Sequence, residues 1–172
     1  FSPKPLRHQP GNGFHINISV KGGNCEDPLS HMIAGILAHI SELTVFLNPT
    51  VASYERFGGP KAPEYISWSN QNRSQLIRVP AAVDAYRRAE LRSPDPTTNP
   101  YLAFALLIYA GLDGIQQKLP LPAPTDLNLF TASADILAGL QRLPLTLREA
   151  ATLAANSSFV SQYLPKTIVQ KT

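Results

Sequence analysis

The sequence predicts an α+β domain in which an antiparallel or mixed, curved sheet carries two long helices on one face. Two patterns support this fold class. Apolar and polar residues alternate in short segments such as 14–20 and 88–92, and apolar residues recur at helical spacing in 28–47 and 100–119. The chain has 172 residues, of which 44% are hydrophobic, which is enough for one domain with a real core.

Composition narrows the classes of function. The single cysteine, Cys25, excludes an internal disulfide and fits a reducing compartment such as the cytoplasm. No uninterrupted apolar run reaches the roughly 18 residues of a membrane span, so we expect no membrane partner. The net charge is +3, and five of the nine arginines fall between positions 73 and 92. Because nucleic-acid surfaces are usually broader and richer in lysine, we expect no nucleic-acid partner.

The first predicted strand covers residues 14–20. Its odd and even positions divide between two faces, with Phe14, Ile16, Ile18 and Val20 on one and His15, Asn17 and Ser19 on the other. This alternation indicates a half-buried strand, and an ordinary sheet with one wet face would show the same pattern. The Gly11–Gly13 segment before it is typical of a tight turn or a close backbone approach.

The first predicted helix runs from Pro28 to about Leu47. Asp27 is suited to cap it, Pro28 fits its first turn, and Asn48-Pro49 ends it. His31 and His39 lie two turns apart on this helix, some 12 Å by the usual rise, so they cannot share a metal ion and are assigned structural roles.

An arginine-rich region, residues 72–95, separates the two predicted helices and follows a loop at 58–63 and a strand at 65–68. In an extended strand Arg88, Glu90 and Arg92 share one face. One interpretation is a surface ladder of ion pairs worth roughly 0–1 kcal/mol each. The other is a wall that binds anions through its arginines, with the glutamate available to a hard cation.

The second predicted helix begins at Asn99-Pro100 and extends to about Leu119. It is apolar nearly all round, so we expect it to be buried. After a proline-rich linker, the sequence of the tail predicts short helices at 132–140 and 146–155, and we expect residues 166–172 to be frayed.

Several segments together resemble the C-terminal half of the glutamine synthetase catalytic domain, over residues 1 to about 130. They are Gly-Asn-Gly-Phe-His at 11–15, Asn-Pro-Thr at 48–50, Asn-Arg-Ser at 72–74, Ile-Arg-Val-Pro at 77–80, Glu-Leu-Arg-Ser-Pro-Asp-Pro at 90–96 and Asn-Pro-Tyr-Leu-Ala-Phe at 99–104. The resemblance implies a division into this catalytic part, 1–130, and a helical tail, 131–172. It also implies a fragment that lacks an N-terminal β-grasp domain and the strands that supply most metal ligands.

The resemblance assigns roles to individual residues. His15 and Glu90 would ligate Mg²⁺ or Mn²⁺, and Arg73 and Arg78 would be catalytic. The implied ATP contacts are Asn17, Ser19, Arg73, Arg78 and Arg88. The implied contacts to the glutamate substrate are Gly11, Arg56, Arg73 and Arg92.

The sequence departs from the family pattern in the predicted flap. The family usually has a glutamate directly before Ala-Pro, which closes the site and helps to deprotonate ammonium, whereas this chain has Lys61. A lysine cation neither accepts a proton nor attracts ammonium. Phe130 stands where some bacterial members carry a tyrosine that is adenylylated, so that control is expected to be absent.

The implied activity is an ATP-dependent glutamate–ammonia ligase, with glutamate, ATP and ammonium as partners and a homo-oligomeric full-length form. We expect the fragment itself to be inactive. Lys61 leaves open a γ-glutamyl ligase that uses another amine, and a non-catalytic nucleotide-binding relative is the third possibility. The hypothesis requires His15 and Glu90 to lie on the same side of the sheet.

Overall fold

In a computed structural model of the chain, which describes residues 1–59, 61–83 and 86–171, a small mixed sheet lies at the centre. Its order is β1-β4-β3-β2. The β1–β4 and β4–β3 pairs are antiparallel and the β3–β2 pair is parallel, which confirms the predicted mixed α+β class. The strands are short: β1 (Ile16–Ile18), β2 (Trp68–Ser69), β3 (Ile77–Arg78) and β4 (Ala89–Leu91).

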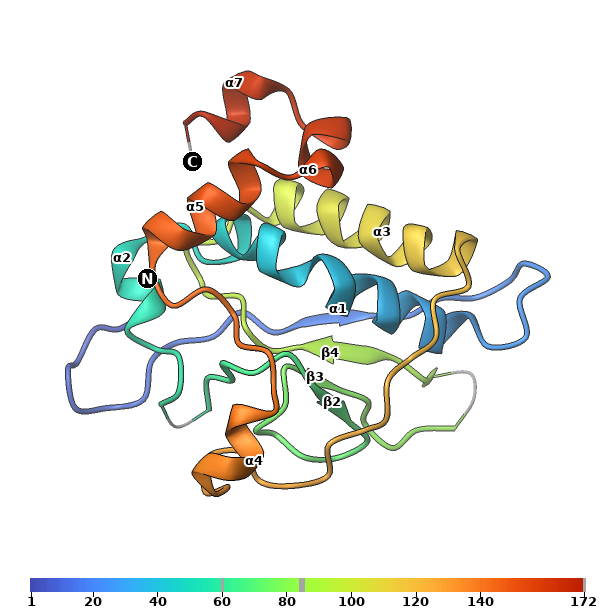
Figure 1. The fold of residues 1–172 in the computed structure, drawn as a ribbon, viewed down its shortest axis with the longest axis horizontal. Helices are drawn as coiled ribbons and strands as arrows, with labels where there is room; N and C mark the ends of the chain where they lie inside the picture. Colours follow the sequence, from blue (N-terminus) through green and yellow to red (C-terminus); the bar gives the residue numbers. More distant parts are fainter. Residues whose placement is uncertain (60, 84–85, 172) are drawn as a thin grey trace.

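Two long helices, α1 (Pro28–Leu47) and α3 (Pro100–Gln116), lie side by side on one side of the sheet (Figure 1). The predicted caps are present, because Asp27 accepts from the backbone of Ser30 and Asn99 accepts from the backbone of Tyr101 and Leu102. The remaining helices are α2 (Val51–Tyr54), α4 (Ala134–Ala138), α5 (Leu147–Ala155), α6 (Ser158–Tyr163) and α7 (Lys166–Val169).

The contact between α1 and α3 brings backbone against backbone. A Cβ atom built on Gly35 would lie 2.7 Å from the nitrogen of Gly114, and one built on Gly114 would lie 2.6 Å from the nitrogen of Gly35. Neither position has room for a side chain. This close pair sets the spacing of the helix layer that supports the sheet.

Three local predictions differ from the structure. The regular part of the first strand is limited to β1, and the predicted strand at 65–68 is replaced by β2, with Tyr65 forming only an isolated bridge to Arg142. The segment expected to fray forms α7 through Val169, while Thr172 lies outside the described residues. Short strands and chain ends depend on their neighbours more than on local pattern, which explains these errors.

The prediction that the second long helix is buried all round is wrong. Tyr101 is 85% exposed and Ile108 is 55% exposed, whereas Leu106 and Leu107 are buried. One apolar face of α3 therefore packs on α1, and another apolar face is exposed to solvent in this chain.

By length and composition α1 alone is apolar enough to cross a membrane, among the helices of the described residues, but most of it is buried inside the fold. Its side chains Ile33, Ile36 and Ile40 are at most 1% exposed and belong to the main hydrophobic core. The apolar character of α1 is accounted for by this core position.

The C-terminal helices share that core. Ala150 of α5 and Val160 of α6 are fully buried in it, and the ring of Tyr163 stacks on Tyr109 of α3 with centroids 3.9 Å apart. The tail thus packs directly on the helix layer, and the division at residue 130 stays a prediction.

Candidate active site

One carboxylate lies at the centre of the candidate site. Glu90 of β4 is 7% exposed, and its two oxygens have different partners. Arg78 of β3 donates from Nε to Oε2 at 2.6 Å, and Arg92 donates from Nη1 to Oε1 at 3.0 Å. Arg78 is directly opposite Glu90 in the β3–β4 register, so strand pairing aligns the two side chains. The sheet thus holds a buried carboxylate between two guanidinium groups.

His15 reaches the same carboxylate from the neighbouring strand. Its Nδ1 lies 3.1 Å from Oε1 of Glu90 and 3.5 Å from Nη1 of Arg92. Asn17 is opposite Glu90 in the β1–β4 register, and His15, two residues earlier, shares its face. The residues assigned as metal ligands therefore lie on one side of the sheet.

The charges around the pair favour a neutral ring and an ionised carboxylate. Burial lowers the pKa of His15, and the charge of Arg92 lowers it further against the opposing effect of Glu90. Burial raises the pKa of Glu90, but the hydrogen bond from Arg78 and the charge of Arg92 outweigh this and hold the pKa below its ordinary value. A neutral imidazole and a carboxylate are the forms that bind metal ions.

This donor set fits a divalent cation in part. Mg²⁺ and Mn²⁺ accept carboxylate oxygen, and an imidazole beside a carboxylate suits Mn²⁺ in particular. Within residues 1–59, 61–83 and 86–171 there is no group of three or more His, Cys, Asp or Glu side chains placed to hold a metal ion. His15 and Glu90 can therefore provide two ligands, and any other protein ligand has to come from elsewhere.

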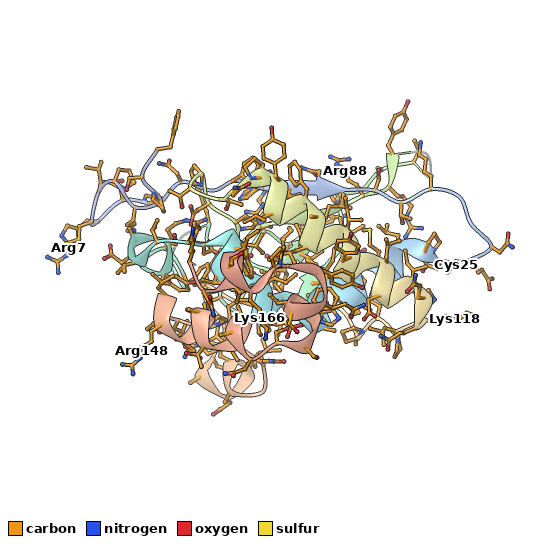
Figure 2. The ribbon with its side chains drawn as sticks, turned by 90° about the horizontal axis from the view of Figure 1, so that it is seen from above. Arg7, Cys25, Arg88, Lys118, Arg148 and Lys166 are labelled. Atoms are coloured by element: carbon orange, nitrogen blue, oxygen red, sulfur yellow. The ribbon has the colours of Figure 1, made fainter. Side chains whose placement is uncertain are left out.

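The residues assigned to ATP lie beside this centre. Arg88 donates from Nε to Oδ1 of Asn17 at 3.0 Å, and Figure 2 shows Arg88 at the surface of the fold near β1. A groove of about 560 Å³ runs along β1, with Asn17 and Ser19 in its lining and Phe104 of α3 facing them. Its size lies in the range of small-molecule sites, and its lining combines apolar and polar groups.

The two remaining arginines assigned to the substrate differ in exposure. Arg73 is exposed, and its backbone oxygen accepts a hydrogen bond from Nε of Arg92 at 3.2 Å, so it stands next to the carboxylate centre. Arg56 is only 3% exposed, and it donates to the backbone oxygens of Ser93 at 3.1 Å and Pro94 at 3.5 Å. Arg56 is thus not a surface residue, and its guanidinium group is held against the backbone that follows Arg92.

Gly11 covers Arg56. A Cβ atom on Gly11 would lie 2.6 Å from Cγ of Arg56 and 2.5 Å from the backbone oxygen of Pro3. Glycine is required here by close approach of the chain to the arginine. The sequence assigned Gly11 and Arg56 to the substrate separately, and the structure places one on the other.

Lys61 is exposed in the predicted flap loop and adopts a left-handed backbone conformation, with φ of 72°. The loop is closed by hydrogen bonds between Gly58 and Ala62 at 3.1 Å and between Ala62 and Gly59 at 3.2 Å. Residue 60 lies outside the described residues. No ion pair of Lys61 is found in the described part of the chain.

Comparison with known proteins identifies the family of this chain. The model of the glutamine synthetase catalytic domain matches residues 1–171. The chain belongs to the glutamine synthetase family. A glutamine synthetase of Methanosarcina mazei is 45% identical over 179 residues, covering 95% of this chain and 40% of the relative. One of Thermotoga maritima is 39% identical over 186 residues, covering 99% of this chain and 42% of the relative.

Solved structures agree with this assignment. A structure titled "GmaS/ADP complex-Conformation 1" superposes with a TM-score of 0.85 at 28% identity, covering 99% of this chain and 44% of the other. Another, "Apo GmaS without ligand", gives 0.84 at 28% identity. The chain spans about 40% of the length of the curated glutamine synthetases it matches.

Two residues of the site region were missed as functional candidates. Asn48 and Asp95 are both 0% exposed, and Asn48 donates to Oδ2 of Asp95 at 3.1 Å. The signal was present, because both lie in segments that resemble the glutamine synthetase family, but local pattern explained Asn48 as a helix end and gave Asp95 no separate role. Only the structure shows that they are buried together beside Arg56.

Proposed function

We propose that the protein containing this chain is an ATP-dependent ligase that joins an amine nitrogen to the side-chain carboxyl of glutamate through γ-glutamyl phosphate, with ammonia as the first candidate amine. The observation that carries the proposal is the Glu90 carboxylate, held by Arg78 and Arg92 and touched by His15. Membership of the glutamine synthetase family supports the reaction class.

The proposed reaction has two steps. A γ-carboxylate oxygen of glutamate attacks the γ-phosphorus of ATP, and the bond to ADP breaks. Ammonia then attacks the carbonyl carbon of γ-glutamyl phosphate, phosphate leaves, and one amine proton is lost to give glutamine. The first step brings a carboxylate to a polyphosphate, and two unit charges at 4 Å repel by about 4 kcal/mol at an effective dielectric of 20.

Guanidinium groups offset this repulsion. Arg73 is exposed to solvent, and Arg78 and Arg88 are half-buried; we assign all three to phosphate oxygens. Arg92 is 4% exposed and donates to Oε1 of Glu90, so we assign it to orienting that carboxylate. Asn17 and Ser19 line the groove that would receive the rest of the nucleotide.

His15 and Glu90 would hold a Mg²⁺ or Mn²⁺ ion. When bound, the ion supplies positive charge at the phosphate oxygens. Arg78 and Arg92 keep the carboxylate ionised, and burial beside Arg92 keeps the imidazole free of its second proton, as the directions of their pKa shifts show.

Lys61 supports a second candidate, a γ-glutamyl ligase for another amine. It occupies the flap position where a proton acceptor is expected in the family, and it is exposed. A cation there raises the local positive potential and disfavours entry of ammonium. A neutral or bulkier amine would meet less opposition.

The test uses the natural full-length polypeptide that contains this chain. Phosphate release is measured with ATP, glutamate and Mg²⁺, first with ammonium and then with a panel of primary amines, and Glu90→Gln serves as the matched control. Turnover with ammonium that Glu90→Gln abolishes supports the first candidate. Turnover only with another amine selects the second, and absence of turnover with every amine rejects both.

The remaining parts of the proposal concern the whole protein. We expect the 172-residue chain alone to be inactive, since its described residues offer only two metal ligands. We also propose a homo-oligomeric full-length form and a cytoplasmic location, to which the single cysteine is suited. Measurable glutamine formation by the isolated chain would contradict the first of these.

A further inference from the structure

Two segments far apart in the chain, one at the end of α1 and one after β4, meet at one buried carboxylate. Asp95 is 0% exposed, and its Oδ2 accepts from Nδ2 of Asn48 at 3.1 Å. Its Oδ1 accepts from the backbone nitrogen of Thr97 at 2.8 Å and from the Thr97 hydroxyl at 2.5 Å. A carboxylate with this many donors is fixed in one orientation.

The guanidinium group of Arg56 lies against that carboxylate. Nη1 of Arg56 is 3.7 Å from Oδ2 of Asp95, and the side chains are 2% and 0% exposed. Burial lowers the pKa of Arg56, and the charge of Asp95 opposes this. Because a buried cation is costly without a compensating anion, Asp95 is what allows Arg56 to be charged at this depth.

Arg56 in turn contacts two parts of the candidate site. It donates to the backbone oxygen of Ser93, directly after Arg92 in the chain. A Cβ atom on Gly13 would lie 3.5 Å from Nη2 of Arg56 and 3.1 Å from Nε2 of His15, so the arginine also lies close to the histidine. The chain carrying His15 and the chain leaving β4 are therefore joined through Arg56.

We infer that Asp95, with Asn48, is a positioning residue for the binding of the amino-acid substrate, acting by fixing Arg56 under the Gly11–Gly13 segment and beside His15. The inference rests on the proposed function for its substrate. Asp95 cannot touch that substrate itself, since it is fully buried and its oxygens are occupied by Asn48, Thr97 and Arg56.

Three buried polar atoms around this network have no hydrogen-bond partner within the described residues: Oδ1 of Asn48, the hydroxyl of Tyr54 and Nε of Arg56. Burial raises the pKa of Tyr54, and the charge of Asp95 raises it further, so the tyrosine stays neutral.

The experiment compares steady-state kinetics of the natural full-length protein and its Asp95→Asn variant, which keeps the volume and removes the charge. We expect the KM for glutamate to rise by roughly 3- to 100-fold, the range of couplings within one network, while the KM for ATP changes by less than about 2-fold. Equal changes in both constants, or no change in either, would overturn the inference.

Two further variants separate positioning from general damage. Asp126→Asn makes the same change at an exposed aspartate outside this network, so it should keep the KM for glutamate. In an Arg56→Gln background, Asp95→Asn should add little to the KM, because its effect passes through the arginine. Full additivity of Arg56→Gln and Asp95→Asn would contradict an action through Arg56.

Two further measurements apply if Asp95→Asn does not fold or if the full-length protein shows no turnover. Should Asp95→Asn not fold, Asn48→Ala removes one donor to Asp95 and should raise the same KM. Should no amine support turnover, the proposed function is rejected, and a crystal structure of either variant still decides the positioning. An Arg56 side chain that keeps its contacts to Ser93 and Pro94 in that variant would overturn it.

Discussion

Nδ1 of His15 lies 3.1 Å from Oε1 of Glu90, although the two residues come from opposite ends of the first hundred positions. The antiparallel pairing of β1 with β4 creates this proximity, and the arginines on β3 and after β4 keep the carboxylate charged. A nitrogen and an oxygen so placed are the two ligands of the cation site proposed above.

The cation site gives the first prediction. In the full-length protein, Arg78→Gln removes the partner of Oε2 and should weaken Mn²⁺ binding by roughly 10- to 100-fold, as loss of an orienting contact does at other metal sites. Isothermal titration or the paramagnetic relaxation of water protons measures the affinity. Arg142→Gln, which breaks an ion pair to Glu64 away from the site, is the control and should leave it unchanged.

The helix layer gives a stability prediction. Gly35→Ala places a methyl group against the backbone of α3 and should lower the free energy of unfolding by about 1–3 kcal/mol or more, because the two helices must separate. In Gly139→Ala, the added Cβ meets its nearest atom only at 3.6 Å, so this control should fold with near-normal stability. Urea denaturation followed by circular dichroism distinguishes them, and equal stability of the two variants would refute the close contact.

A histidine between two carboxylates fastens α1 to α3. Nδ1 of His39 lies 2.5 Å from Oε1 of Glu42, Nε2 lies 3.0 Å from Oδ2 of Asp113, and the ring stacks on Phe159 of α6 at 3.8 Å. Both ring nitrogens thus lie within hydrogen-bond distance of a carboxylate, one on each helix. His39→Gln should therefore destabilise the protein by about 1–3 kcal/mol at neutral pH. A thermal unfolding temperature equal to that of the wild type would exclude this role.

The same cluster predicts a pH dependence. The hydrogen bond from His39 lowers the pKa of Asp113 below its ordinary value of 3.8. A carboxyl group with a lowered folded-state pKa contributes stability above its ordinary pKa and loses it as the pH falls through the folded value. The difference in unfolding free energy between wild type and Asp113→Asn should thus be full at neutral pH and shrink below pH 3.8. The exposed Asp126→Asn is the control, and a difference that grows in acid would contradict the assignment.

Lys61 gives the prediction on amine choice. If its charge hinders ammonium, Lys61→Glu in the full-length protein should raise kcat/KM for ammonium by roughly 10- to 100-fold, at the lower end of what a general base contributes. Lys61→Gln removes the charge without a proton acceptor and should give a smaller gain. Both side chains meet the same left-handed backbone, so strain does not separate them. Unchanged ammonium kinetics in both variants would show that the flap charge is irrelevant.

Most of the fold followed from local rules. The caps and period of α1 and the start of α3 were predictable, because they depend on residues within one or two turns. The open face of α3, with Tyr101 exposed, was not predictable, since apolar residues on all sides look alike whether or not a neighbour covers them. The short β2 depended in the same way on its parallel partner β3.

The sequence by itself determined the family resemblance, the alternation that puts His15 and Asn17 on one face, and the face shared by Arg88, Glu90 and Arg92. Only the tertiary structure decided which of these side chains meet. It placed His15 on Glu90, joined Arg88 to Asn17, and buried Arg56 against Asp95 and backbone carbonyls. The physical reason is that local pattern fixes the direction of a side chain along its own strand or helix, whereas its contacts and burial depend on the register and packing of elements far apart in the chain.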